Sequence, residues 1–184
     1  MKVRLEKTFP MPAPADAAWA LLQDVAGVAA CMPGAKITEQ VDATHYKGTV
    51  SVKVGPASLS FRGEIEVKRI DPSTRTLQLF AKGTDTTGTS AATMDLTARV
   101  NAQDASSCSL AGESEVSMSG KAASFGARLM GPVSDQVLGQ FAANFAARLA
   151  QAPRQAEGKP LNALALAWAV IRGWLRSLFG GKGA

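Results

Sequence analysis

The sequence predicts an α+β fold, in which a curved antiparallel sheet of seven strands wraps on one long helix and a separate amphipathic helix follows. Three observations predict it. Apolar and polar residues alternate over residues 3–9 and again over 36–119, where turn residues recur at short intervals. Apolar residues then recur at every fourth position over 121–150. A polar, proline-bracketed stretch over 152–160 separates that segment from a last apolar one.

The chain begins with a predicted strand over residues 3–9, followed by two short helices. Pro10 and two further prolines before position 15 are expected to end the pairing of this strand. An alanine-rich stretch that begins at Asp16 predicts the first helix. Asp24 is expected to cap the second helix, which should end before Met32 because Pro33 disfavours helical geometry in the residue before it.

Six further strands fit between the turn signals from Lys36 to Ser119. The turns are too short to hold crossover helices, so we expect an antiparallel meander with one buried and one solvated face. Four carboxylates share the positions of the solvated face and are expected to form salt bridges there: Glu64, Glu66, Glu113 and Glu115.

The helical period over 121–150 predicts one long helix with an apolar stripe, kinked at Gly131-Pro132. A sheet with one long helix and two short helices encloses a space that either side chains or an apolar ligand must fill. The residues expected to line it, rich in methionine and therefore adaptable, are Trp19, Met32, Val50, Val52, Phe61, Leu79, Met94, Met118, Phe125 and Leu129.

These features divide the chain into a ligand-binding domain over 1–151, a linker over 152–160, an amphipathic helix over 161–179 and a flexible end over 180–184. Two arginines within this helix argue against a membrane crossing and favour a position in the membrane interface; packing on the body or on a partner is the alternative. The residues expected to bind the membrane are Leu164, Trp168, Ile171, Arg172, Trp174, Leu175, Arg176, Leu178 and Phe179.

Charge and rare residues exclude several classes of function. Residues 1–151 carry 15 Lys and Arg against 14 Asp and Glu, and residues 152–184 carry five against one, so most of the net charge of +5 lies in the tail. A nearly neutral body does not suit nucleic acid, whereas a basic tail suits an anionic membrane surface. With no stretch that resembles a signal peptide, a cytoplasmic protein on the inner face of the membrane is expected. Cys31 and the single histidine, His45, lack a third partner, so neither a catalytic nor a metal site is expected.

Several motifs resemble those of a known family. Trp19, Leu22 and Asp24, followed by Cys-Met-Pro-Gly at 31–34, resemble the opening signature of the CoxG family of carbon monoxide dehydrogenase. The resemblance covers about residues 1–150 and implies the helix-grip fold of the START and birch-pollen-allergen superfamily. Two further matches are Val-Lys-Val-Gly-Pro at 52–56 with Phe-Arg-Gly at 61–63, and the glycine-containing approach to the last helix at 120–129.

The resemblance implies a non-catalytic accessory protein that attaches a molybdenum-containing hydroxylase of the carbon monoxide dehydrogenase type, or a related enzyme of the xanthine oxidase type, to the membrane. Together with an apolar space and a membrane-binding tail, it suggests that the space takes up a respiratory quinone, menaquinone or ubiquinone; no covalently bound cofactor is expected. Two alternatives stay open. One is a cyclase or aromatase of the same fold, which would need polar groups in a pocket whose inward positions are mostly aliphatic. The other is a structural tether with a filled core.

Overall fold

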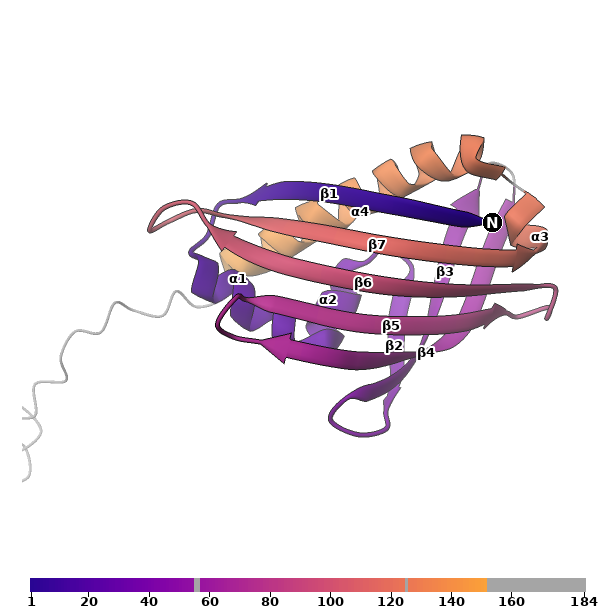
Figure 1. The fold of residues 1–184 in the computed structure, drawn as a ribbon, viewed down its shortest axis with the longest axis horizontal. Helices are drawn as coiled ribbons and strands as arrows, with labels where there is room; N and C mark the ends of the chain where they lie inside the picture. Colours follow the sequence, from indigo (N-terminus) through magenta and orange to yellow (C-terminus); the bar gives the residue numbers. More distant parts are fainter. Residues whose placement is uncertain (55–56, 125, 152–184) are drawn as a thin grey trace, which may run out of the picture. The chain divides into compact units, whose positions relative to one another are not determined.

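The structure is a computed structural model that describes residues 1–54, 57–124 and 126–151, without the side chains of 54, 57 and 126–130. The linker and the tail helix expected after residue 151 therefore lie outside the described residues. The elements, shown in Figure 1, are β1 (Lys2–Met11), α1 (Ala15–Gln23), α2 (Val25–Cys31), β2 (Ala35–Gln40), β3 (His45–Val54), β4 (Ala57–Asp71), β5 (Thr76–Asp85), β6 (Ser90–Ala102), β7 (Cys108–Gly120), α3 (Lys121–Ser124) and α4 (Gly126–Gln151).

The seven strands form one antiparallel sheet in the order β1-β7-β6-β5-β4-β3-β2. Strands β2 to β7 follow one another as the predicted meander, and β1 closes against β7 at the other edge. In Figure 1, α4 lies behind β1, β7 and β6, with α1 near the end of the sheet where α4 finishes and α3 near the opposite end. The predicted α+β architecture is confirmed.

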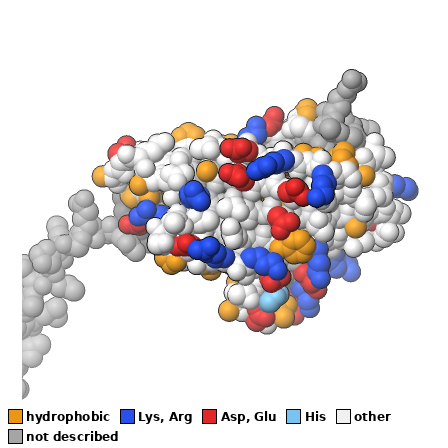
Figure 2. Space-filling model, in the orientation of Figure 1, with side chains coloured by type: hydrophobic (Ala, Val, Ile, Leu, Met, Phe, Trp, Pro, Cys, Tyr) orange, Lys and Arg blue, Asp and Glu red, His pale blue; other side chains and the backbone are white. Residues whose placement is uncertain are grey.

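The outer face of the sheet, away from α4, is polar. Each of the four predicted carboxylates forms an ion pair across or along the strands, and Figure 2 shows acidic and basic side chains interspersed over this face. Such exposed pairs contribute at most about 1 kcal/mol each, so their main effect is to keep the face soluble. The pairs are Lys2–Glu115, Arg4–Glu113, Lys68–Glu66 and Lys82–Glu64.

A glycine allows close contact between two strands on the inner face. Gly63 of β4 lies opposite Gly83 of β5 and Gly48 of β3 in the strand register. A Cβ atom at Gly63 would collide with the carbonyl oxygen of Lys82 and lie 2.8 Å from the Cα of Gly83. Only glycine therefore permits this approach of the β4 and β5 backbones, which suits a sharply bent sheet.

Two helix boundaries follow from local hydrogen bonds. Asp24 caps α2 as predicted, since its carboxylate accepts a bond of 2.9 Å from the amide of Gly27. The predicted single helix over 121–150 is instead two helices, α3 and α4. The α3 turn is bonded to the β5–β6 hairpin, because the amide of Ala122 donates to Ser90 Oγ at 3.0 Å and that of Lys121 to the carbonyl of Thr89.

The expected break at Pro10 was wrong. Pro10 lies within β1 and pairs with Ser109 of β7. Because β1 is an edge strand, one of its backbone sides has no neighbouring strand, and a proline that donates no hydrogen bond is tolerated there.

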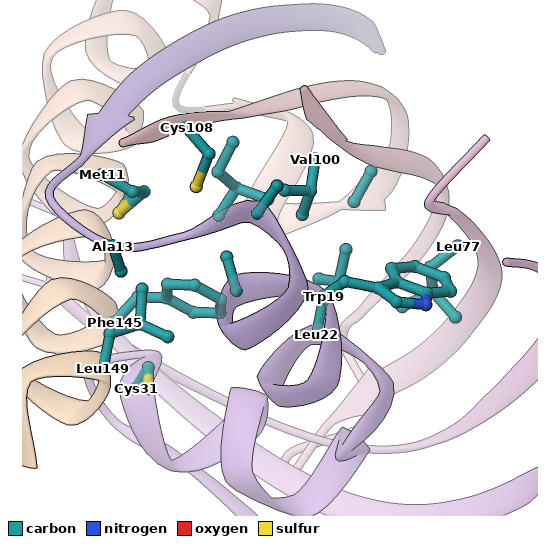
Figure 3. Packing of buried hydrophobic residues seen from close by; sticks show 14 of the residues in the cluster. Met11, Ala13, Trp19, Leu22, Cys31, Leu77, Val100, Cys108, Phe145 and Leu149 are labelled. Carbon is teal, nitrogen blue, oxygen red and sulfur yellow. The ribbon is translucent and has the colours of Figure 1, made fainter. Parts of the chain in front are cut away.

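A closed hydrophobic core lies at the end of the sheet covered by α1 and α2. Figure 3 shows its side chains converging from α1, from α4 and from the sheet. Phe145 of α4 is 0% exposed, and Trp19 of α1 is 8% exposed. The amide of Asn144 also donates a hydrogen bond of 2.9 Å to the carbonyl of Cys31, which links α4 to α2. This end of the domain is therefore filled by the protein's own side chains.

Candidate functional site

On the inner face, strands β5, β6 and β7 are buried at both ends and half-buried between them. Along β6, Ser90 is buried, the inward residues from Ala92 to Leu96 are half-buried, and Ala98 and Val100 are buried again. On the outer side of β6 the residues are exposed or half-buried and none is buried, so the burial at the two ends arises on the inner side. Solvent therefore reaches the middle of the inner face but not its ends.

The neighbouring strands repeat the pattern. On β7, Leu110 and Met118 are buried, and the inward residues between them are half-buried. On β5, Leu77 and Asp85 are buried, and Leu79 and the other inward residues between them are half-buried. We call the half-buried inward side chains the central patch: Leu5, Val50, Val52, Phe61, Ile65, Leu79, Ala81, Ala92, Met94, Leu96, Ser114 and Val116.

Helix α4 crosses the inner face, and only part of its apolar stripe is buried. Among the described residues, several of its Cα atoms lie within 8 Å of those of α1, α2, β1 and β3. Its middle residues Val133, Val137 and Phe141 are half-buried, whereas Phe145 and Leu149 near its end are buried. The predicted apolar stripe is thus divided into a part that fills the closed core and a part that is accessible to solvent.

The ten residues predicted to line the space fall into three groups. Val50, Val52, Phe61, Leu79 and Met94 lie in the central patch, with their side chains on the inner face. Trp19 and Met118 are buried at opposite ends of the inner face, and Met32 is half-buried just after α2. The side chains of Phe125 and Leu129 lie outside those that the structure describes. The strand period also predicts further inward residues, including Leu5, Leu96, Ser114 and Val116.

One carboxylate on the inner register is fully engaged by its own hairpin. Asp85, opposite Phe61 in the strand pairing, accepts hydrogen bonds from Thr87 Oγ1 at 2.6 Å and from the amides of Thr89 and Ser90 at 2.7 and 3.0 Å. The Thr87 hydroxyl and the other donors keep the pKa of Asp85 below its usual range. Its lone pairs are directed to the turn, so Asp85 holds the hairpin rather than presenting a proton acceptor to the patch.

An ion pair connects the edge strand to the long helix beside the central patch. Lys7 Nζ of β1 lies 2.8 Å from Asp135 Oδ1 of α4. Both side chains are exposed, at 43% and 62%. The pair is therefore screened by solvent and contributes little to stability, but it places a charged, hydrated boundary on the β1 side of the patch.

The residues considered for nucleophilic chemistry do not form a pair. Cys31 is buried in the core, where burial raises the pKa of its thiol, and its Sγ atom is 3.3 Å from the carbonyl oxygen of Gly27. His45 is exposed at the start of β3, with Nδ1 2.9 Å from a carboxylate oxygen of Asp42. Within the described part of the chain, no three His, Cys, Asp or Glu side chains converge as metal ligands would.

A depression of about 450 Å³ lies on the opposite, outer face. Its lining includes Arg4, Lys68, Asp95 and Glu113, whose register places them outside the sheet. The lining also includes Leu79, Leu96 and Ser114, whose side chains lie on the inner register, but half of its residues are charged, and such a surface does not suit an apolar ligand. The central patch is therefore the better candidate for the site.

Comparison with protein families identifies the chain. The model of the carbon monoxide dehydrogenase CoxG family matches residues 8–150, which include most of the chain and nearly all of the described fold. The chain belongs to the CoxG family. This confirms the resemblance carried by the motifs around Trp19, Cys31 and Phe61. No curated protein matches the chain significantly.

Solved structures confirm the START-like helix-grip fold expected of a CoxG protein. A conserved protein from Geobacillus kaustophilus has 18% identity and a TM-score of 0.73, and the match covers 81% of this chain and 96% of that one. The ZhuI aromatase/cyclase from Streptomyces sp. R1128 has 18% identity and a TM-score of 0.61, with 86% and 99% covered. A START superfamily protein from Mycobacterium smegmatis has 12% identity and a TM-score of 0.55, with 82% and 99% covered. At these identities the likeness concerns the fold alone.

The membrane-binding residues predicted between Leu164 and Phe179 all lie outside the described residues. Within the described part of this CoxG-family chain, no helix combines the length and the apolar character that a membrane span requires.

Proposed function

We propose that this protein is a non-catalytic accessory protein of a molybdenum-containing dehydrogenase of the carbon monoxide dehydrogenase type, and that it binds a lipophilic ligand on the central patch. The observation that carries the proposal is the burial pattern. The patch is an apolar surface on the inside of the fold that the described side chains leave accessible, although the inward side chains of β5, β6 and β7 are buried at both ends of these strands. An apolar ligand on this surface would remove it from water.

The ligand that fits this role is a respiratory quinone, menaquinone or ubiquinone. A quinone combines an isoprenoid chain, which needs an apolar environment, with a ring that accepts electrons. The adaptable side chain of Met94 and the aromatic ring of Phe61 suit such a ligand. The family to which the chain belongs supports a dehydrogenase as the partner.

The tail supplies access to the membrane in this proposal. Its tryptophans and arginines would hold residues 161–179 at an anionic surface on the cytoplasmic face of the membrane, so that the domain is close to the source of quinone. The dehydrogenase would then meet both the protein and its ligand near the bilayer.

The geometry favours this proposal over a cyclase of the same fold. Cyclisation requires groups that move protons near the substrate, but Asp85 is bonded to its own turn and the thiol of Cys31 is buried in the core. Most side chains of the central patch are aliphatic, which suits binding better than acid-base chemistry.

Extraction of protein purified from membranes tests the ligand. Organic extraction and mass spectrometry of the full chain should yield a quinone. Ala92→Trp, on the inner face of β6, should reduce the yield at least several-fold by filling the patch, whereas Ala91→Trp on the exposed outer side of the same strand should not. A wild-type protein that consistently yields no lipophilic molecule would leave the structural tether as the better account.

Vesicle sedimentation tests the tail separately. Replacing Arg172 and Arg176 by Glu in the full chain should strongly weaken binding to vesicles that contain about one third anionic lipid, because each basic residue near such a surface contributes about 1 kcal/mol. Replacing Arg154 and Lys159 by Glu, both in the predicted linker, is the control with an equal change of charge. Equal sedimentation of the tail variant and the wild type would contradict membrane binding through this helix.

A further inference from the structure

The central patch contains one strand residue with a polar side chain, Ser114 of β7. The strand register places it between Leu5 of β1 and Leu96 of β6, on the inner face. Its neighbours in the sequence, Glu113 and Glu115, lie on the outer face and pair there with Arg4 and Lys2. The orientation of Ser114 toward the inside therefore follows from the pairing of the whole strand.

Among the described residues, no side-chain hydrogen bond includes the hydroxyl of Ser114. Within the same part of the chain, no fully buried side-chain nitrogen or oxygen lacks a partner. The hydroxyl is therefore accessible from the patch, where it is free to donate. Covering it with a purely apolar molecule would cost the free energy of an unmade hydrogen bond.

Polar groups are distributed unevenly around the patch. On the β7 and β1 side, Ser114 lies diagonally from Lys7, whose ammonium group pairs with Asp135 of α4. On the other side, β3 and β4 present Val50 and Phe61 as directly opposed partners, and the carboxylate of Asp85, opposite Phe61 on β5, is bonded to its own hairpin. A molecule with one polar and one apolar end would gain most by lying with its polar end toward β7 and β1.

We infer that the Ser114 hydroxyl donates a hydrogen bond to a carbonyl oxygen of the lipophilic ligand and thereby orients its polar end toward β7, with the apolar part along β3 and β4. This inference rests on the proposed function, since it concerns the same site. It makes Ser114 a specificity-determining residue that discriminates between a ring that carries carbonyl groups and a hydrocarbon of the same shape.

A matched pair of probes tests this role. Menadione and 2-methylnaphthalene share their fused ring and methyl group, but only menadione has carbonyl oxygens. Both would be titrated against full-length protein loaded with the apolar fluorophore diphenylhexatriene, and displacement would give their affinities. Ser114→Ala should weaken menadione about 2- to 10-fold, as expected for the loss of one neutral hydrogen bond, and change 2-methylnaphthalene by less than 2-fold.

Two further variants complete the test. Ser117→Ala, on the outer register of the same strand, should leave both probes unchanged, and Ser114→Thr should retain preference for menadione because it keeps a hydroxyl. If the wild type binds 2-methylnaphthalene but Ser114→Ala weakens both probes equally or neither, the assignment of Ser114 is overturned while the proposed function stands. If the wild type binds neither diphenylhexatriene nor 2-methylnaphthalene, the proposed function and this inference both fail.

Discussion

Two leucines on the inner face should respond differently to the same substitution. Leu96 lies in the half-buried central patch, and Leu110 on the adjacent strand is 5% exposed in the closed core. Replacing Leu110 by Ala removes three carbons, worth about 2.4 kcal/mol at ~0.8 kcal/mol each. It also leaves a cavity, which adds roughly 1 kcal/mol for about 40 Å³ of unfilled volume. We therefore expect a loss of about 3 to 4 kcal/mol in the free energy of unfolding.

Leu96→Ala should cost only about 1 to 2 kcal/mol, because part of the side chain is already solvated and no closed cavity forms. The difference of about 2 kcal/mol corresponds to roughly 4 to 8 °C in melting temperature for a domain of this size. Urea unfolding of the full chains, followed by far-ultraviolet circular dichroism, measures both values. Equal losses at the two leucines, within about 0.5 kcal/mol, would show that the central patch is closed in solution and would refute the reasoning behind the site.

Three further predictions concern the frame around the patch. Asp85→Asn should lower the melting temperature at pH 7, and its difference from wild type should shrink below about pH 4. A carboxylate with a lowered pKa stabilises the fold above its unfolded-state pKa and loses that effect as it is protonated. Asp95→Asn on the outer face is the control, and a difference in melting temperature that does not depend on pH would contradict this role of Asp85. Gly63→Ala should destabilise the domain by about 1 to 3 kcal/mol, because the added Cβ collides with β5. Gly139→Ala in α4 has open space around the added Cβ and should stabilise the domain by about 0.5 to 1 kcal/mol. Equal melting temperatures for the two variants would contradict the close contact between β4 and β5. Cys31 and Cys108 are buried, and burial raises the pKa of both thiols. A thiol reagent should therefore label both cysteines only after the chain unfolds. Rapid labelling of the native chain at neutral pH would contradict their burial.

The sequence period was enough to predict which strand residues face inward, and Val50, Phe61 and Met94 lie where it placed them. It could not predict which inward residues are covered. Leu77 and Met118 satisfy the same apolar pattern but are buried, because α1 with its Trp19 side chain and α3 close the two ends of the face. Coverage depends on how separate elements pack, and that information is absent from the period of any one strand.

Local preferences were overridden where the fold supplied a different environment. Proline usually interrupts a strand, but Pro10 lies on an edge strand, where its missing backbone N–H leaves no hydrogen bond unmade. The start of the helix expected from residue 121 is fixed by tertiary contacts, since Gly120 has φ of 68° and the hydroxyl of Ser90 accepts a hydrogen bond from the amide of Ala122 in α3. The sequence does not single out Ser114, because a serine within an alternating strand is common on either face, and only its lack of a described partner distinguishes it.

The pairing of β1 with β7 determines when the domain can be completed during synthesis. The amino group of Met1 donates a hydrogen bond of 2.7 Å to the carbonyl of Met118, so the first and last strands are neighbours although the rest of the sheet separates them in sequence. Such distant pairing closes a long loop and slows folding. The first strand must wait while the meander emerges from the ribosome, and α4 follows later still. The central patch is therefore among the last parts to assemble, and an incomplete chain would expose its apolar strands to aggregation or to chaperones.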